Sequence, residues 1–402
     1  MSLSYNPEAF IASLPASYSE KSWLADLQKE GRQLVEEQGF PTRKVENWKY
    51  TNIDALVKSQ FAPSSDATAD AALIPTIENT YQIVFINGLY QAELSSTDLP
   101  AGVTLLPLST ALDSHEATVQ EMLSEPCPEA VDAFTHLNRS CIAEGAFLHI
   151  ARKTTVDKAI RIVHLATSAE VISQPRNLIL IDELAEADLL EEYIAPKGSE
   201  IQYFCNAVTD IKVAKAAVLH HTTNQAESKE AFHIASTRVK VARDAQYNSF
   251  AFSSGSQISR HFIDVELNDE NAYADISGLY TTKGKQLCDN HSVINHNKPF
   301  TFSKQLYKGI LNDRSRAVFN GKVHIVRDAQ KCDSNQLNKN ILLSKAARVD
   351  TKPELEVFAD DVKAAHGATV GQLSDEELFY LQSRCIDKDA ATALLIHAFI
   401  NE

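Results

Sequence analysis

The side chains best suited to chemistry in this 402-residue sequence are its cysteines and histidines, because thiolates and imidazoles bind metals. The cysteines stand at positions 127, 141, 205, 288, 332 and 385, and none of them forms a C-x-x-C pair. This spacing excludes a ready-made zinc or ferredoxin-type site. In a reducing compartment they stay free thiols, and a buried thiol behaves as a small apolar side chain. Cys332 has a basic neighbour that favours a thiolate, but we interpret it as an ordinary thiol as well.

Among the histidines, His366 is the best candidate for a ligand. It lies in Ala364-Ala-His-Gly-Ala-Thr369, a small-residue segment in which an imidazole is sterically open. No second ligand lies nearby in sequence, so composition alone favours a structural histidine. His220 and His221 are adjacent and would point to opposite faces of a strand, so they do not converge on one metal. We interpret the remaining candidates, His291 and His296, as corner histidines without a role.

Motifs for common enzyme chemistry are absent from the sequence. It contains no G-x-x-x-x-G-K-[ST], G-x-G-x-x-G or G-x-S-x-G segment, so we expect neither ATP hydrolysis nor the usual dinucleotide or nucleophile sites. The best carboxylate group is Asp264, Glu266, Asp269 and Glu270. It leaves open an alternative, a β-helix enzyme acting on polysaccharide, although solvated faces produce such patterns routinely.

Charge and hydropathy narrow the choice of partners and compartment. The formal net charge of −15 would repel phosphate backbones and anionic lipid, which excludes nucleic acid and membrane surfaces as partners. Met1 to Phe10 has neither a basic nor an apolar leader region, and no apolar run approaches the length of a bilayer span. We therefore expect a cytoplasmic protein.

The elements that would position these side chains are mainly short strands that recur at a fixed period. Strands are predicted to start at Ala187, Ala216, Ala245 and Ala272, which are 29, 29 and 27 residues apart. Such a period is typical of a solenoid, in which each repeat buries its apolar face against the next. Repeats made of strands alone indicate a parallel β-helix, with a β-sandwich as the alternative.

The same pattern continues toward the C-terminus. Arg316 to Val326 alternates apolar and polar residues as a strand does, with Asn320-Gly321 as a predicted corner. There is room for one further coil near Asp289 to Asn295.

Three regions follow from these patterns. Residues 1–145 are expected to be helical with some strand, 146–372 to form the β-helix core, and 373–402 to form a helical hairpin that is either a cap or a docking element for a partner. In the first region, helices are predicted over Ser19 to Phe40 and around Leu108 to Gly145, the latter broken at Pro126 and Pro128. In the last, Ser374-Asp-Glu-Glu377 fits a capping box, and Asp387 opens a second helix.

Long motifs stand near both ends of the chain. Between Leu311 and Gln372 the sequence contains L-N-D-R-S-R-A-V-F-N-G-K-V-H-I-V-R-D-A-Q-K, N-K-N-I-L-L-S, K-P-E-L-E-V-F-A-D-D-V-K and H-G-A-T-V-G-Q-L. These motifs resemble the SufB/SufD family of iron–sulfur cluster assembly proteins. Glu46-Asn-Trp-Lys-Tyr-Thr51 is similar to the R-x-E-x-W-K-Y-T signature of the SufD branch. The signature and the modest length favour that branch over SufB.

The resemblance implies a right-handed parallel β-helix between helical regions, which acts as a non-catalytic scaffold. It implies pairing with SufB through the β-helices and contact with the ABC-type ATPase SufC, which would supply ATP hydrolysis. It also leaves open a homodimer of the isolated chain. The candidate residues for docking SufC are those of the C-terminal hairpin: Glu377, Leu378, Phe379, Leu381, Leu394, Leu395 and Phe399.

The resemblance further makes His366 a candidate ligand or helper for a nascent iron–sulfur cluster at the SufB interface. A cysteine found in some relatives two residues earlier is Ala364 here, so the remaining ligands would come mostly from SufB. No stably bound cofactor is expected. A transient iron–sulfur cluster at the interface, and a reduced flavin in the complex, are expectations from the family alone.

Overall fold

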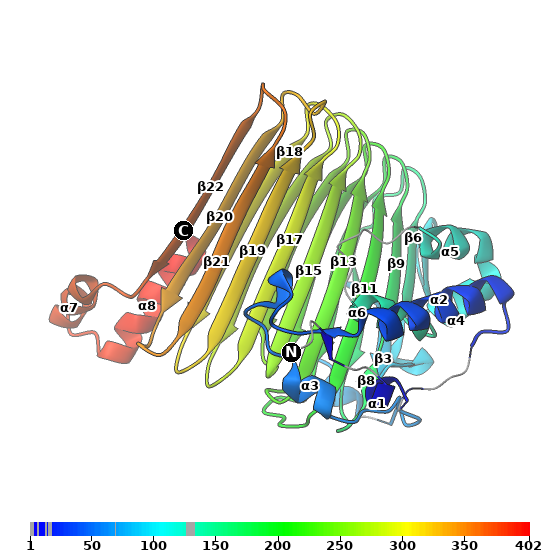
Figure 1. The fold of residues 1–402 in the computed structure, drawn as a ribbon, viewed down its shortest axis with the longest axis horizontal. Helices are drawn as coiled ribbons and strands as arrows, with labels where there is room; N and C mark the ends of the chain where they lie inside the picture. Colours follow the sequence, from blue (N-terminus) through cyan, green and yellow to red (C-terminus); the bar gives the residue numbers. More distant parts are fainter. Residues whose placement is uncertain (1–3, 6–7, 13, 15–17, 69, 126–132) are drawn as a thin grey trace.

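The computed structural model describes the chain except for residues 1–3, 6–7, 13, 15–17, 69 and 126–132. Its body is a parallel β-solenoid made of two ten-stranded sheets, with helices at both ends (Figure 1). The predicted mainly-β fold is confirmed. The β-sandwich alternative is wrong, because successive strands of each sheet run parallel. Among the helices in the described part of the chain, none is long and apolar enough to cross a membrane.

Two strand orders define the solenoid. Sheet 1 runs in the order β22 (Lys363–Gly371), β20 (Asp333–Leu342), β18 (Phe302–Leu311), β16 (Tyr273–Thr282), β14 (Gln246–Ser254), β12 (Val218–Ala226), β10 (Glu186–Ile194), β7 (Ala159–Leu165), β3 (Thr80–Ile86) and β4 (Leu89–Tyr90). Sheet 2 runs in the order β21 (Arg348–Val357), β19 (Arg316–Ile325), β17 (Leu287–His296), β15 (Ile258–Leu267), β13 (Phe232–Val241), β11 (Phe204–Val213), β9 (Arg176–Ile181), β6 (Ala146–Ile150) and β5 (Val103–Pro107), with β8 (Ile172–Ser173) beside β11. A separate pair joins β1 (Ser4–Tyr5) to β2 (Phe40–Pro41).

The sequence period corresponds to one full turn of the solenoid. The predicted starts at 187, 216, 245 and 272 fall within two residues of the first residues of β10, β12, β14 and β16, which are neighbours in sheet 1. Each turn also contains a strand of sheet 2, so β11, β13 and β15 alternate with them along the chain. The strand predicted from Arg316 is β19, and the further coil is β17. The sequence pattern therefore predicted the correct period. In the central repeats it identified only one of the two strands of each turn.

The corner predicted at Asn320-Gly321 is wrong, because both residues lie inside β19. Gly321 does not form a turn. It leaves space for side chains of neighbouring strands to come close together. A Cβ atom at Gly321 would come within 2.4 Å of Gln336 Nε2 and 3.0 Å of Gln305 Oε1. Only a residue without a side chain leaves room for these two glutamines inside the solenoid.

The actual corners use residues that tolerate a left-handed backbone. Asp244 and Asn271 occupy equivalent corners with φ of 58° and 60°. Asp and Asn adopt this conformation more readily than most residues. The corners also stack, since Asn271 Nδ2 donates to Asp244 Oδ1 at 2.9 Å and the Asp244 amide donates to the Glu270 carbonyl at 3.2 Å.

The solenoid interior changes from apolar to polar along its axis. Alternate residues of each strand face inward, and Ile160, Leu189 and Ile211 are among the fully buried apolar side chains of the N-terminal half. Further along, Ile276 is in register with Gln305, and Gln305 with Gln336. Both glutamines are buried. A buried amide requires hydrogen-bond partners, so this part of the core is held by a polar ladder.

Helices cover the N-terminal end of the solenoid (Figure 1). They are α1 (Glu8–Ile11), α2 (Ser22–Gln38), α3 (Asp54–Lys58), α4 (Leu108–Ser114), α5 (Glu116–Leu123) and α6 (Ala133–Ser140), with short 3₁₀ turns at Glu46–Trp48, Ala71–Leu73 and Ala92–Leu94. The helix predicted over Ser19 to Phe40 is α2, which ends at Gly39 with φ of 67°. The stretch predicted around Leu108 to Gly145 is three short helices, and Pro126 and Pro128 lie outside the described residues.

The segment Glu46 to Thr51 anchors the N-terminal region to the outer face of sheet 2. Trp48 is buried, and the Arg260 guanidinium of β15 lies 4.0 Å from the centre of its ring system. Arg260 also pairs with Asp289 of β17. Asp289 accepts a hydrogen bond from Thr51 Oγ1 and lies 2.9 Å from His291 Nε2. Burial opposes ionisation of Asp289, but Arg260 and His291 outweigh it and hold the pKa of this carboxyl well below its usual range.

We expect Asp289→Ala to lower the free energy of unfolding by about 3–5 kcal/mol, because it leaves the buried Arg260 without its counter-charge. Urea unfolding followed by circular dichroism measures this change. Asp188→Ala, at an exposed position of β10, is the matched control and should change stability by less than about 0.5 kcal/mol. Equal stability of the two variants would contradict a central role for Asp289 in this anchor.

Candidate functional site

The C-terminal end of the solenoid presents two sheet edges. Among the described residues, β22 pairs on one side only, with β20, and β21 pairs in its sheet only with β19. At the other end the sheets finish in the short antiparallel strands β4 and β5, next to the N-terminal helices. Unpaired backbone groups on an edge strand are a template for another strand. The two ends therefore differ chemically, and only the C-terminal one offers long parallel edges.

His366 lies on β22 at this open end, and its imidazole is exposed. It is in register with Gln336 of β20, so it continues the inward-facing column that contains Gln305. Gln336 Nε2 donates to Gln305 Oε1 at 2.7 Å, and Gln305 Nε2 donates to Ser292 Oγ at 2.5 Å. Within the described part of the chain, the buried Gln336 Oε1 has no hydrogen-bond partner. His366 thus ends a polar interior row, and it is exposed because no further coil covers it.

The neighbouring thiol chemistry is limited. Ala364 faces the same side of β22 as His366, two residues earlier, and packs in part against a small apolar group that includes Ala359. Cys332 precedes β20 but is buried, with its sulfur 3.0 Å from Thr301 Oγ1. Its burial agrees with the interpretation of an ordinary thiol. The last coil therefore presents an imidazole to solvent, whereas the cysteine of the preceding coil is buried.

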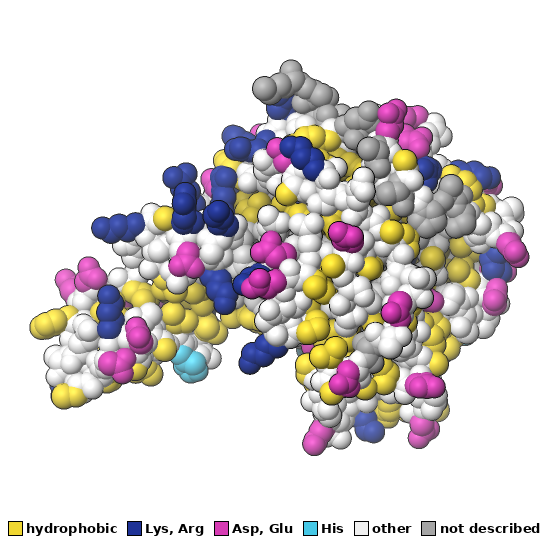
Figure 2. Space-filling view, turned by 90° about the horizontal axis from the view of Figure 1, so that it is seen from below, with side chains coloured by type: hydrophobic (Ala, Val, Ile, Leu, Met, Phe, Trp, Pro, Cys, Tyr) yellow, Lys and Arg dark blue, Asp and Glu magenta, His cyan; other side chains and the backbone are white. Residues whose placement is uncertain are grey.

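Two helices follow the last strand. They are α7 (Asp375–Ser383) and α8 (Lys388–Asn401), and both start where the sequence predicted. Ser374 accepts a hydrogen bond from the Glu377 amide, and Asp387 accepts one from the Ala390 amide. These side chains satisfy amide groups that have no partner within the helix. The helices α7 and α8 extend beyond the solenoid (Figure 1), and Figure 2 shows apolar side chains gathered on this part of the surface.

The end of α8 is fixed to the outer face of sheet 1. Lys308 Nζ of β18 donates to the carbonyls of Phe399 at 2.8 Å and Ile400 at 3.1 Å, which lie at the negative end of the helix dipole. It also lies 5.4 Å from the centre of the Phe399 ring. Lys339 of β20 pairs with Glu402 at 3.0 Å. The hairpin therefore has one fixed end at α8.

The predicted docking residues differ in accessibility. Phe379 is 72% exposed and Leu394 50% exposed, so both are available to a partner. Glu377 is exposed as well, whereas Leu378, Leu381, Leu395 and Phe399 are partly buried. Phe399 lies under Lys308, so its ring contributes to fixing α8.

The histidines set aside in the sequence lie at structural positions. His221 is buried with its Nε2 atom 2.9 Å from Glu191 Oε2, whereas His220 is exposed on the opposite face of β12. The prediction that the two point apart is confirmed. His291 pairs with Asp289, and both ring nitrogens of His296 contact hydroxyls, of Thr301 and Ser303. His291 and His296 lie within β17, so their interpretation as corner residues is wrong.

The four carboxylates considered for a polysaccharide enzyme all make contacts within the fold. Asp264 is buried and accepts a hydrogen bond from Asn295 Nδ2 at 2.9 Å. Glu266 accepts from Asn268, and Glu270 pairs with Arg243 at 2.7 Å. Asp269 Oδ1 accepts from the Glu270 amide. These contacts assign the group to the structure of β15 and its corner instead of to a free carboxylate pair.

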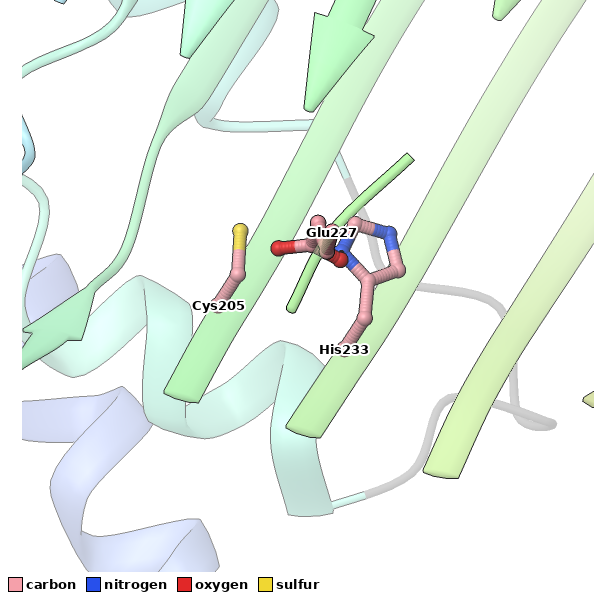
Figure 3. Close-up of side chains that lie close together, drawn as sticks. All are labelled: Cys205, Glu227 and His233. Atoms are coloured by element: carbon pink, nitrogen blue, oxygen red, sulfur yellow. The ribbon is translucent and has the colours of Figure 1, made fainter. Parts of the chain in front are cut away.

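Sequence reasoning missed a second group of side chains inside the solenoid. Cys205, Glu227 and His233 point toward one another (Figure 3), and their donor atoms all lie within 4.8 Å of each other. Their separations of 22 and 6 residues match no short motif. The only signal was indirect: Cys205 and His233 are 28 residues apart, close to the solenoid period.

The comparisons with known proteins agree with this architecture. Residues 164–399 match the family described as "SUF system FeS cluster assembly, SufBD core domain", and residues 16–162 match the "SufBD protein N-terminal region". The iron–sulfur cluster assembly protein SufD of Escherichia coli (strain K12) is 34% identical over 373 residues, which cover 90% of this chain and 84% of that protein. A SufBD family protein of Synechocystis sp. is 32% identical over 405 residues, covering 96% and 88%. SufD of Bacillus subtilis (strain 168) is 24% identical over 405 residues, covering 98% and 92%.

The fold and its open end define a parallel β-solenoid protein with exposed sheet edges. The chain belongs to the SufBD family of iron–sulfur cluster assembly proteins, and its relatives include proteins named SufD.

Asp264 provides a test of the structural role given to the carboxylate group. Burial, helped by Glu266, raises the pKa of Asp264 from its ordinary value to about 6. A carboxyl whose pKa is higher in the folded than in the unfolded state loses stability as the pH rises through the folded value. We therefore expect Asp264→Asn to stabilise the protein at pH 8, by on the order of 2 kcal/mol, and to have little effect near pH 4.

Urea unfolding of Asp264→Asn and the parent chain at pH 4, 6 and 8 measures this difference. Asp360→Asn, at an exposed corner, is the control and should follow the parent chain at every pH. A stability difference that does not grow with pH would contradict the raised pKa.

Proposed function

We propose that this chain is the SufD-type scaffold subunit of an iron–sulfur cluster assembly complex. The observation that carries the proposal is the open end of the solenoid, where His366 stands in an inward-facing column between two sheets with unpaired edges. Family membership supports an assembly role, and the resemblance of the Glu46 to Thr51 segment supports the SufD branch. In this proposal the chain hydrolyses no ATP itself, and the partner ATPase SufC does so.

The partner at the open end is SufB in this proposal. A second β-helix of the same family would place its own terminal strands against β21 and β22 and so satisfy their backbone groups. His366 would then lie at the junction of two solenoid interiors, withdrawn from bulk water. The nascent iron–sulfur cluster is the substrate there, with most ligands from SufB, and a reduced flavin in the complex stays a prediction.

The same edges are available to a second copy of this chain when SufB is absent. A homodimer of the isolated chain is therefore part of the proposal. Sedimentation of the single chain and of the chain co-expressed with SufB and SufC distinguishes the two assemblies. A chain that stays alone when all three proteins are co-expressed would refute the scaffold role.

We expect His366→Ala to leave folding and SufB binding intact and to lower the yield of iron–sulfur clusters on the complex several-fold, because the side chain is exposed and packs against little. Cluster formation on the reconstituted complex, followed by absorbance, measures the yield. His220→Ala removes an imidazole that is exposed on the outer face of β12 and is the matched control. An unchanged yield of iron–sulfur clusters in His366→Ala would mean that His366 has only a structural role.

SufC is proposed to bind the helical hairpin through its exposed apolar side chains. Burial of Phe379 in such an interface would make Phe379→Ala weaken SufC binding by about 2 kcal/mol or more, roughly thirtyfold in Kd. Isothermal titration with SufC measures the affinity. Phe250→Ala, which removes an exposed ring from β14, should bind like the parent chain. Equal affinities of the two variants would place the SufC contact elsewhere.

A further inference from the structure

The group formed by Cys205, Glu227 and His233 lies far along the solenoid from the open end. Cys205 on β11 and His233 on β13 are direct register partners, so their side chains stand side by side on the inner face of sheet 2. Glu227 enters from the corner between β12 and β13 and turns its carboxylate toward both (Figure 3). The strands β15, β17 and β19 separate this group from β21.

All three side chains are withdrawn from solvent. Cys205 is 3% exposed, and the side chains of Glu227 and His233 are 2% and 3% exposed. His233 Nδ1 lies 2.9 Å from Glu227 Oε2, and the same carboxylate oxygen accepts a hydrogen bond from Gln225 Nε2 at 2.9 Å. Burial would raise the pKa of Glu227, but His233 and these hydrogen bonds outweigh it and lower the pKa below its ordinary value. The group therefore contains a buried carboxylate beside an imidazole.

The electrostatics of the thiol are opposite. Burial and the charge of Glu227 raise the pKa of the Cys205 thiol well above its usual range. The thiol is thus protonated at neutral pH as long as no cation lies beside it. A positive ion between Cys205 and Glu227 would offset both the burial and the repulsion that keep the proton on sulfur.

A small cavity adjoins the group. Its lining includes Cys205, Glu227, Tyr203 and His164, and it has room for about one water molecule or ion. The Tyr203 hydroxyl is buried beside Glu227 without a well-formed hydrogen bond. Such a hydroxyl is placed to bind a water molecule in the cavity.

A larger pocket lies next to this cavity. This pocket of about 200 Å³ lies between the N-terminal helices and the first coils and is open to solvent on one side. Asn87, Gly88, His164 and Ser173 line both spaces, so the two adjoin one another.

We propose that Cys205, Glu227 and His233 bind one divalent cation of borderline softness, with Zn²⁺ as the ion that best fits this donor set. A thiolate, an imidazole and a carboxylate are the three common protein ligands of Zn²⁺, and donors about 2.0–2.3 Å from a tetrahedral ion lie roughly 3.5 Å apart. The observed donor separations need only small side-chain movements to reach this geometry. The fourth position is left for a water molecule that the Tyr203 hydroxyl holds.

Binding at this site releases the proton of Cys205: the S–H bond breaks, the thiolate forms a bond to the metal, and the proton leaves to solvent. His233 binds as the neutral imidazole through Nδ1, and its ring proton is carried by Nε2. The ion then joins two adjacent coils of sheet 2 and the corner that precedes β13. This site is independent of the proposed assembly function, because neither His366 nor the hairpin takes part in it.

The test is a titration of the metal-free full-length chain with Co²⁺, a spectroscopic substitute for Zn²⁺. We expect one equivalent to produce a thiolate-to-cobalt charge-transfer band in the near ultraviolet, which Zn²⁺ abolishes. Release of one proton makes the apparent affinity rise about tenfold per pH unit near neutrality. Zn²⁺ should also raise the midpoint of thermal unfolding of the parent chain.

Two variants locate the site. Cys205→Ala should lose the band and the thermal shift, and Glu227→Gln, which keeps the shape and most hydrogen bonds, should bind at least about tenfold more weakly. Cys288→Ala is the matched control, because Cys288 is a buried thiol in the same inward-facing column as Cys205, three strands further along sheet 2. It should retain the band.

The proposal is overturned by any of three results. These are no charge-transfer band in the parent chain, a band of unchanged intensity in Cys205→Ala, or equal loss in Cys205→Ala and Cys288→Ala. If Cys205→Ala does not fold, Glu227→Gln decides, and its binding Co²⁺ as tightly as the parent chain would overturn the site.

Discussion

The in-register stacking of parallel coils is the constraint on which the rest of this structure depends. Each strand satisfies its backbone groups only through the strands of the coils before and after it, so register is passed along the whole solenoid. Side chains about 30 residues apart thereby become neighbours in columns, as Gln305, Gln336 and His366 do. The same rule leaves the last coil unsatisfied. A solenoid of this kind therefore needs either a cap or a partner at its open end.

The columns also explain how a narrow interior holds so many polar groups. Phe85, His164 and Tyr193 are successive members of one column and stack with ring centres 5.0 Å apart. Burial lowers the pKa of His164 to about 4, so this imidazole is neutral within the stack. Elsewhere the polar residues form pairs or ladders across coils, as Gln336 Nε2 does with Gln305 Oε1 of the preceding turn. The interior is thus organised along the solenoid axis more than across it.

The N-terminal and C-terminal helices are attached to the solenoid in different ways. At the N-terminal end, Trp48 and Thr51 tie the preceding helices to β15 and β17 through Arg260 and Asp289, which secures the covering layer on sheet 2. At the C-terminal end, Lys308 fixes only the last turn of α8, while the ring of Phe379 stays exposed on α7. The N-terminal helices are therefore held to the solenoid by buried contacts, whereas the C-terminal hairpin keeps an exposed apolar surface.

The sequence by itself determined the repeat, the helix starts at Ser374 and Asp387, and the family, because alternation, capping and motif matches are properties of short segments. It did not determine the second strand of each central turn or the role of Gly321. Which side of a strand points into the solenoid depends on the corners before and after it, and these are fixed only when the coils stack. The sequence named His366 without showing that it ends a polar row. Only the tertiary structure brought Cys205, Glu227 and His233 together, because coil stacking, and no local spacing, makes residues one turn apart adjacent.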